Sequence, residues 1–348
     1  MRLLLRLLML LLVLITLLVA LAFALPDHAR VERSITVARP ASQIYLLLNH
    51  VRRFKDWSPW HQRDPATIYT YSGPDSGVGA KLTWKSAHRD VGEGSQMLVA
   101  ATPDQTVSFE LDFGPRGMAT ARFDIAALNG ETRVTWSFDT KLPLHFDESF
   151  GWGVAGRYLG LFMDRLVGAD FERGLSNLKQ LAEQFPNVDI AGLSAQLVDL
   201  PERRLIYVAV EEDVDDAATL RRWNAAVAQL TRFAAQNGLT ISGAPLSLVT
   251  RQDALAGRFE LALVTHYDVM PEDTLVRGRE LAPARAAQLL HRGDASGRRK
   301  SIEKLRAWMA IQGLHGKDQL IEEYVEGDLL QGAARISMPL QAEAVQAH

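Results

Sequence analysis

Hydrophobic and polar positions alternate through much of the stretch from Arg33 to Phe138, which predicts a series of strands. Ala80, Leu82 and Trp84, for example, share one face of such a strand. The alternating runs lie at residues 34–37, 80–84, 107–113, 119–125 and 134–138, with weaker ones at 68–71 and 95–100. Because each clear strand has one apolar and one polar face, we expect an antiparallel sheet that covers a core on one side.

A helical period replaces this alternation from Gly160 to Phe185, where apolar residues recur every three or four positions. A sheet closed by such a helix leaves an elongated space between the two. The aromatic residues on the inner strand faces are Trp84, Phe109, Phe123, Trp136 and Phe138. The space either holds an apolar ligand or is filled by these side chains, and the pattern leaves both open.

Beyond a linker at Pro186–Asp189, the remaining chain contains an internal repeat at an offset of 75 residues. The matching positions are Val227, Leu230, Phe233, Gly238 and Leu239 in one half and Ile302, Leu305, Trp308, Gly313 and Leu314 in the other. Each half reads strand, helix, strand, strand, over 205–210, 216–237, 246–250 and 259–267, and over 284–291, 301–312, 320–326 and 334–340. Two such units, paired edge to edge, form one sheet with both helices on one face and a concave groove on the other.

The strand predicted at 320–325 carries two carboxylates. Alternation places Glu322 with Tyr324 on one face and Glu323 with Ile321 on the other. Either one glutamate faces an apolar interior, where it needs a partner or a ligand, or the strand lies at an edge with both in solvent.

Aromatic residues offer candidate walls for the groove, namely Tyr207, Trp223, Tyr267, Trp308 and Tyr324. Trp223 and Trp308 lie on helices, where packing in the core explains them as well. Tyr267 and Tyr324 lie at or near strand ends. An aromatic pair beside one carboxylate suits a lipophilic cation, since the two attractions together contribute on the order of 2 to 4 kcal/mol.

The N-terminus carries the strongest single signal of the sequence. From Leu7 to Leu25 nothing is more polar than Thr16, and these 19 residues would span roughly 28 Å as a helix, about the thickness of a membrane core. Residues 1–30 are therefore either a retained membrane anchor, which the length of the run favours, or a signal peptide cleaved after Ala22-Phe23-Ala24.

The flanking charges predict the orientation of this segment. Arg2 and Arg6 favour a cytoplasmic N-terminus, although Arg30 and Arg33 on the other side weaken that preference. We therefore expect a single-pass protein of the cell inner membrane whose soluble part is periplasmic.

Composition narrows the chemistry. The 348 residues have a formal net charge of -3 and no cysteine. A chain without a basic excess does not neutralise a phosphate backbone, so we expect no nucleic-acid partner. Thiol nucleophiles, thiolate zinc sites and disulfides are excluded by the absence of cysteine.

Several short motifs carry little weight. Gly151-Trp152-Gly153-Val154-Ala155-Gly156 matches a dinucleotide-binding pattern, but no parallel strand precedes it, so a flexible lead-in to the long helix is the better interpretation. The nine histidines show no metal-ligand spacing, and we expect no metal or cofactor. His61, Arg63 and Asp64 fit a solvated loop better than a pocket mouth. The acidic run from Glu211 to Asp216 most simply caps the next helix.

Two family resemblances follow from quoted segments. The first rests on Phe54-Lys55-Asp56-Trp57-Ser58-Pro59-Trp60, Gly77-Val78-Gly79-Ala80, Thr132-Arg133-Val134-Thr135-Trp136 and Phe171 to Lys179. With these segments, residues 33–185 resemble the START-like, polyketide-cyclase-type (SRPBCC) domains. The resemblance implies a helix-grip fold with a deep hydrophobic pocket, found in carriers, cyclases and hydrolases alike.

The second resemblance covers residues 190–341 and rests on Pro283 to Gly293, the Trp308 helix that ends at Gly313, and Ile321-Glu322-Glu323-Tyr324. This part is similar to the gyrase-inhibitor-like (GyrI-like) effector-binding domains. The resemblance implies that Glu322, followed by Tyr324, points into a pocket for lipophilic and often cationic compounds. The chain departs from the regulators of that family because it has no helix-turn-helix segment.

The sequence thus predicts an α+β protein with a helix-grip domain, a duplicated β-α-β-β domain and one N-terminal transmembrane helix. We expect it to bind hydrophobic small molecules in two pockets without catalysis, as a sensor or carrier. The ligand-binding candidates are Glu322, Tyr324, Tyr267, Trp308, Trp84, Phe109 and Trp136. The alternatives are a cyclase or hydrolase with Glu322 as general base, and a scaffold whose pockets are filled by side chains. Ligand identity and oligomeric state stay open.

Overall fold

The computed structural model describes residues 2–114, 117–144, 150–273 and 275–341. The chain divides into two compact units, Met1–Asp189 and Ile190–His348. The first helix, α1 (Arg2–Ala24), contains the apolar run. Its segment Leu3–Ala24 is long and apolar enough to cross a membrane, as a signal sequence also is.

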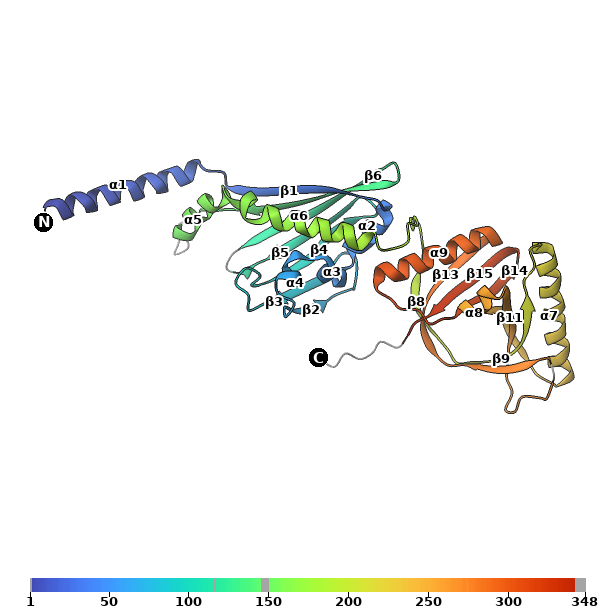
Figure 1. The fold of residues 1–348 in the computed structure, drawn as a ribbon. Helices are drawn as coiled ribbons and strands as arrows, with labels where there is room; N and C mark the ends of the chain where they lie inside the picture. The colour runs from blue at the N-terminus through green and yellow to red at the C-terminus, as the bar shows by residue number, and fades with distance from the viewer. Residues whose placement is uncertain (1, 115–116, 145–149, 274, 342–348) are drawn as a thin grey trace. The chain divides into compact units, whose positions relative to one another are not determined.

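The first unit is built on a seven-stranded antiparallel sheet with the strand order β1-β7-β6-β5-β4-β3-β2 (Figure 1). The strands are β1 (His28–Val37), β2 (Ile68–Ser72), β3 (Lys81–Lys85), β4 (Glu93–Thr102), β5 (Thr106–Asp112), β6 (Met118–Leu128) and β7 (Glu131–Lys141). Buried and exposed positions alternate along β5 and β6, as the sequence predicts. The weaker runs at 68–71 and 95–100 are also strands. The first strand begins at His28 rather than at Ser34, because it pairs with β7 along its whole length.

Helices cover one face of this sheet. The short ones are α2 (Ala41–Asn49), η1 (Val51–Arg53), α3 (Phe54–Trp57) and α4 (Pro59–Arg63), and the long one is α6 (Met163–Ala182). Figure 1 shows α6 lying across the strands in the manner of a helix-grip fold. Phe171, Leu175 and Leu178 are buried on its inner side.

The helix predicted over 160–185 is α6 (Met163–Ala182), which begins three residues later and ends three residues earlier than expected. A separate helix, α5 (Phe150–Gly160), precedes α6, with a turn between them. The glycine-rich segment 151–156 lies inside α5, so its interpretation as a flexible lead-in is wrong. His61 and Arg63 also belong to a helix, α4, rather than to a solvated loop. Arg63 forms an ion pair with Asp170 of α6, with an Nη2–Oδ1 distance of 2.6 Å.

The second unit contains one eight-stranded sheet, ordered β12-β9-β11-β10-β14-β15-β13-β8. The first half comprises β8 (Gln196–Leu200), β9 (Arg203–Glu211), α7 (Asp216–Gln236), β10 (Ile241–Val249), α8 (Arg251–Leu255) and β11 (Arg258–Thr265). The second half comprises β12 (Arg277–Leu281), β13 (Ala284–Asp294), α9 (Ala295–Gln312), β14 (Leu320–Gly327) and β15 (Gln331–Pro339). The halves meet where β10 pairs with β14. This arrangement confirms the predicted duplication and edge-to-edge pairing, and Gly238 and Gly313 after the two helices both have positive φ.

Two short strands were missing from the sequence-based prediction. β8, which precedes the first half, pairs with β13 of the second half. β12, which precedes the second half, pairs with β9 of the first half. Each half therefore supplies the outermost strand of the other. Both strands are only five residues long and carry charged or polar residues, so neither gives a clear alternating pattern.

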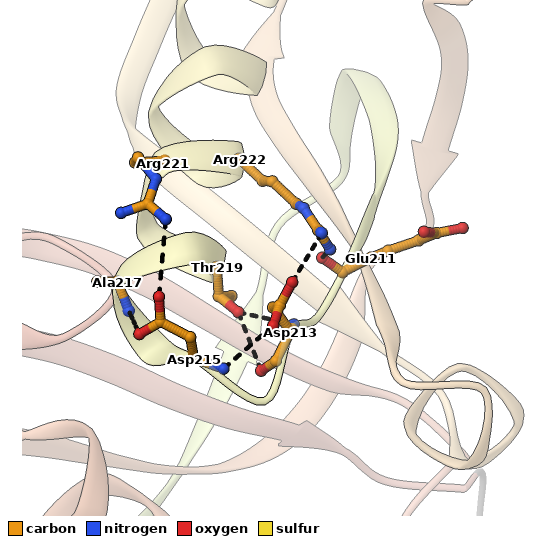
Figure 2. A network of polar contacts seen from close by, with 7 residues as sticks. All are labelled: Glu211, Asp213, Asp215, Ala217, Thr219, Arg221 and Arg222. Atoms are coloured by element: carbon orange, nitrogen blue, oxygen red, sulfur yellow. Dashed lines mark hydrogen bonds and ion pairs between the residues drawn. The ribbon is translucent and has the colours of Figure 1, made fainter.

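The acidic run before α7 acts as the predicted helix cap. Asp215 is the N-cap residue, and its carboxylate accepts a hydrogen bond of 3.0 Å from the Ala217 backbone N–H. Figure 2 shows this network, in which Asp213 also pairs with Arg222 at 2.8 Å. These carboxylates have local structural partners, which explains the run without a ligand.

Candidate functional site

The first unit encloses an apolar cavity of about 250 Å³, bounded by the sheet, the short helices and α6. This exceeds the roughly 150 Å³ that is enough for a benzene ring in an apolar cavity. The predicted aromatic residues all line it, namely Trp84, Phe109, Phe123, Trp136 and Phe138. The structure thus leaves an open volume where the sequence alone could not decide between a ligand space and a filled core.

Trp136 of β7 forms the centre of the aromatic wall. Its ring stacks on Phe171 of α6, with the centroids 4.0 Å apart and the planes 9° from parallel. On its other side it stacks on Phe123 at 5.0 Å. Because Trp136 is held between two rings, it forms a rigid part of the wall.

Trp84 is the other predicted tryptophan of the wall, and a glycine makes room for it. Gly94 lies opposite Trp84 in the β3–β4 register. A methyl group at position 94 would lie only 2.6 Å from the indole ring. The ring can therefore lie across β4 only because position 94 has no side chain.

Gln96 places a polar group in this otherwise apolar wall. The side chain lines the cavity, and the residue is only 6% exposed. Within the described residues its carboxamide makes no hydrogen bond. This group can therefore donate to, and accept from, a ligand that brings its own polar atom into the cavity.

His50 and Tyr69 add two more polar groups to the lining. Burial lowers the pKa of His50, which keeps the imidazole neutral near pH 7. Its Nδ1 atom is buried and has no hydrogen-bond partner among the residues that the structure describes. Burial raises the pKa of Tyr69 to about 12, so its hydroxyl stays protonated and able to donate.

The second unit has a groove of about 280 Å³ on the sheet face opposite the helices. In contrast to the cavity, its lining includes charged side chains from both halves of the repeat. They are Arg203, Arg279, Glu280, Lys317 and Glu323. Glu323 is neutralised by Arg335 at 2.8 Å and by Arg203 at 3.7 Å.

The groove placement predicted for Glu322 and Tyr324 is wrong. Both side chains point to the helix side of the sheet, whereas Glu323 and Ile321 line the groove. Glu322 Oε2 lies 2.7 Å from Nε of Arg298 on α9, and the Tyr324 hydroxyl donates to the same carboxylate at 3.3 Å. The alternation was predicted correctly, but which face carries the groove depends on where the helices pack. The role of Glu322 in binding stays a prediction.

Burial dominates the electrostatics of this pair. Glu322 and Arg298 side chains are each about 10% exposed. Burial raises the pKa of Glu322, and the Arg298 guanidinium opposes that shift. Tyr324 packs edge-on against Trp223 of α7, with the ring centroids 5.7 Å apart. Glu322, Arg298 and Tyr324 thus pair with one another beneath the two helices.

Tyr267 and Trp308, the other candidates of the second unit, lie apart from the groove lining. The Tyr267 hydroxyl donates to the Leu205 carbonyl at 3.2 Å, and its ring packs against the core beneath α7. Trp308 packs against the core beneath α9. The structure therefore brings together Trp84, Phe109 and Trp136 in the cavity. In the second unit Glu322 and Tyr324 lie together, but none of the four candidates lines the groove.

Sequence reasoning missed Gln96, His50 and Tyr69. Gln96 lies on the same face of β4 as the buried Leu98, so the weak strand pattern at 95–100 held a usable signal. His50 follows α2 in an irregular segment, where no period predicts the direction of a side chain. Among the described residues, no group of three or more acidic or histidine side chains could hold a metal ion.

Comparison with protein families supports the resemblance predicted for the first unit. The family model described as polyketide cyclase / dehydrase and lipid transport matches residues 28–183. This segment is therefore similar to that family. The sequence-based resemblance is thereby confirmed for this part of the chain, and the family match extends from β1 to the end of α6. A comparison with curated proteins finds no match.

Solved structures give distant likenesses. Protein CV1439 from Chromobacterium violaceum is 13% identical with a TM-score of 0.31, and the match covers 45% of this chain and 97% of that one. A norcoclaurine synthase mutant from Thalictrum flavum is 13% identical with a TM-score of 0.33, and the match covers 45% of this chain and 95% of that one. The EcmrR C-terminal domain is 16% identical with a TM-score of 0.35, and the match covers 42% of this chain and 97% of that one.

Proposed function

We propose that the first unit binds an apolar small molecule carrying one polar group, without catalysis, in a protein that α1 holds at the cell inner membrane. The observation that carries this proposal is the apolar cavity with the unpaired Gln96 carboxamide in its wall. The match of residues 28–183 to a family described in part by lipid transport supports a hydrophobic ligand.

A carrier or sensor fits the cavity better than an enzyme. The titratable groups of the lining, His50, Tyr69 and Asp90, form no hydrogen bonds with one another in the described part of the chain. General acid–base catalysis needs such groups within reach of one reacting atom. For the alternative enzyme, Glu322 would have to act as a base while bound to Arg298.

The membrane location is part of the same proposal. The apolar α1 supports an anchor, and Arg2 and Arg6 before it favour a cytoplasmic N-terminus with both units in the periplasm.

The second unit is proposed as a GyrI-like binding domain whose ligand site is the groove. The duplicated strand-helix-strand-strand halves support this. The lining favours a polar or zwitterionic ligand over a purely lipophilic cation, because the Glu323 carboxylate already has two arginine partners.

Binding in the cavity can be tested with naphthalene and 2-naphthol, which differ by one hydroxyl. Ala121, which is 5% exposed and lines the cavity, is changed to leucine to fill it. The full-length protein in detergent should bind both probes, and Ala121→Leu should abolish binding. The difference between the two proteins separates the cavity from probe dissolved in the micelle.

Ala119→Leu is the matched control, since Ala119 is buried on the same strand but does not line the cavity. It should lower the free energy of unfolding by about 1 to 3 kcal/mol through overpacking, whereas Ala121→Leu should not. Gln96→Leu should weaken the binding of 2-naphthol about fivefold relative to that of naphthalene, which is the typical net contribution of one hydrogen bond. Equal probe binding by the wild type and Ala121→Leu would overturn the proposal.

A further inference from the structure

The corner between α5 and α6 exposes a group of large apolar side chains. Leu159, Leu161, Phe162 and Leu166 are 55%, 53%, 52% and 59% exposed. We call these four residues the apolar corner. Four such residues within eight positions are unusual on a water-exposed surface, and groups of this kind mark contact sites.

Polar contacts of α6 fix the corner's orientation. Arg33 of β1 binds Asp164 and Glu172 on α6, with Nη1–Oδ1 and Nε–Oε1 distances of 2.7 Å each. Gly168 lies against the same guanidinium. One side of α6 is therefore bound to the sheet, which leaves Phe162 and Leu166, one turn apart, on an open side.

The corner is joined to α1 by hydrogen bonds. The Tyr158 hydroxyl donates to the Leu18 carbonyl at 2.7 Å, and the Arg157 guanidinium donates to the Leu25 carbonyl at 2.6 Å. Ala22 of α1 is fully buried, although most of that helix is exposed. The C-terminal part of α1 and the end of α5 thus pack together.

These bonds determine a depth if α1 crosses a membrane. Leu18 precedes Ala24, the last residue of α1, by six positions, which is about 9 Å along a helix axis. Amphipathic segments that lie in a bilayer surface bury their apolar side by roughly 5–10 Å. Tyr158 also suits that depth, since tyrosines are enriched where the hydrocarbon meets the headgroups.

We propose that the apolar corner inserts into the surface of the bilayer that α1 crosses, so that lipid covers Leu159, Leu161, Phe162 and Leu166. The proposal rests on the membrane anchor proposed above. Lipid is the occupant favoured over a protein partner because the corner is continuous with the apolar surface of α1. The insertion also bears on the cavity, because Val167, next to Leu166, is part of the cavity lining. The same end of α6 thus contacts lipid and lines the ligand space.

The absence of cysteine makes a direct test possible. Single cysteines replace Phe162, Leu166, Val13 and Val78 in the full chain, which is reconstituted into vesicles of phosphatidylcholine and phosphatidylglycerol and labelled with a nitroxide. The collision rates of each label with oxygen, which concentrates in lipid, and with a water-soluble nickel complex are then compared.

Val13→Cys, in the middle of α1, reports whether the anchor is in the membrane, and Val78→Cys, on a loop and 61% exposed, is the aqueous control. The oxygen-to-nickel ratio at Phe162 and Leu166 should exceed that at Val78 severalfold and lie below that at Val13. If the ratios at Phe162 and Leu166 equalled that at Val78 while Val13 was deep in lipid, the insertion of the apolar corner would be contradicted, but the membrane anchor would not. Low collision rates with both reagents at Phe162 would indicate a protein partner and also overturn it. Aqueous ratios at all four positions would overturn the anchor itself.

Discussion

Gln96 shows most directly how one residue shapes the cavity. Leucine at this position would pack with Leu82 and Leu111, its neighbours on the adjacent strands. The carboxamide instead makes no hydrogen bond among the described residues, although the residue as a whole is only 6% exposed. Because Gln96 lines the cavity, its carboxamide can bond a molecule that brings a polar atom, which a leucine could not do.

His50 makes the stability of the first unit sensitive to acid. Burial lowers its pKa, so below about pH 6.5, the usual value of the unfolded chain, the unfolded state binds a proton that the folded state does not. The stabilising contribution is present above that pH and is lost as the pH falls. His50→Gln should therefore reduce the loss of stability between pH 7 and 5, by up to about 1.4 kcal/mol per pH unit, as measured by denaturant titration.

His266→Gln is the control for this experiment. His266 is a histidine with an 82% exposed side chain in the other unit. Its replacement should leave the pH dependence of the first unit's unfolding unchanged. An identical acid dependence of wild type and His50→Gln would contradict the prediction.

The residues of the site differ in how far the sequence could predict them. Trp84, Phe109 and Trp136 lie on strands whose alternation fixes their side, and all three line the cavity. The groove face of β14 could not be obtained in the same way. Alternation separates Glu322 from Glu323, but both faces of this strand are partly apolar, and only the packing of α9 distinguishes them.

At the scale of the element, β14 carries different chemistry on its two faces. Glu322 points toward α9 and pairs with Arg298, whereas Glu323 points into the groove and pairs with Arg335. The pair under the helix is the more deeply buried of the two, because Arg335 is 42% exposed and Arg298 only 10%. The energetic cost of breaking a pair should differ accordingly.

Glu322→Gln is expected to destabilise the second unit by about 3 to 5 kcal/mol, since it leaves the Arg298 charge buried and unpaired. The double variant Glu322→Leu/Arg298→Met should recover most of this loss because it removes both charges. Denaturant unfolding of each variant measures the difference.

Glu326→Gln serves as the matched change on the same strand. Its side chain is 72% exposed beside Arg292, so the expected effect is below about 1 kcal/mol. If Glu322→Gln were as stable as the wild type, the ion pair would not support α9, and a role in ligand chemistry would become the better explanation.

Long periodic elements were the most predictable part of the fold. The β5 and β6 strands and the α7 and α9 helices follow from period and end signals, since burial on one face forces a repeating pattern. β8 and β12 were missed because a five-residue outer strand buries little, so its sequence is hardly constrained. The helix predicted from Gly160 begins at Met163, because Leu161 and Phe162 lie in a turn although their apolar side chains fit the helical pattern.

At the scale of the whole molecule, the two units have separate hydrophobic cores and should unfold as separate transitions. A ligand that binds only the first unit should raise only the unfolding temperature of that unit. With 2-naphthol at 100 times its dissociation constant, the stabilisation is about 2.7 kcal/mol, or a rise of roughly 5–11 °C for a unit of this size. Scanning calorimetry of the full chain in detergent measures this.

Ala121→Leu provides the control, as its transition should not move with 2-naphthol. Equal shifts of both transitions in the wild type would show that the probe acts through the detergent or binds both units. Either result would contradict binding confined to the cavity.

Because each half supplies an outer strand to the other, the second unit does not divide into two independent halves despite its repeat. A cut in the loop between β11 and β12 would produce two fragments, each lacking the strand that completes its own sheet edge and carrying the strand that fits the other. The fragments would be complementary, so each would be fully paired only in the presence of its counterpart. The covalent connection through this loop therefore keeps the two complementary pieces in equal amounts and at high local concentration.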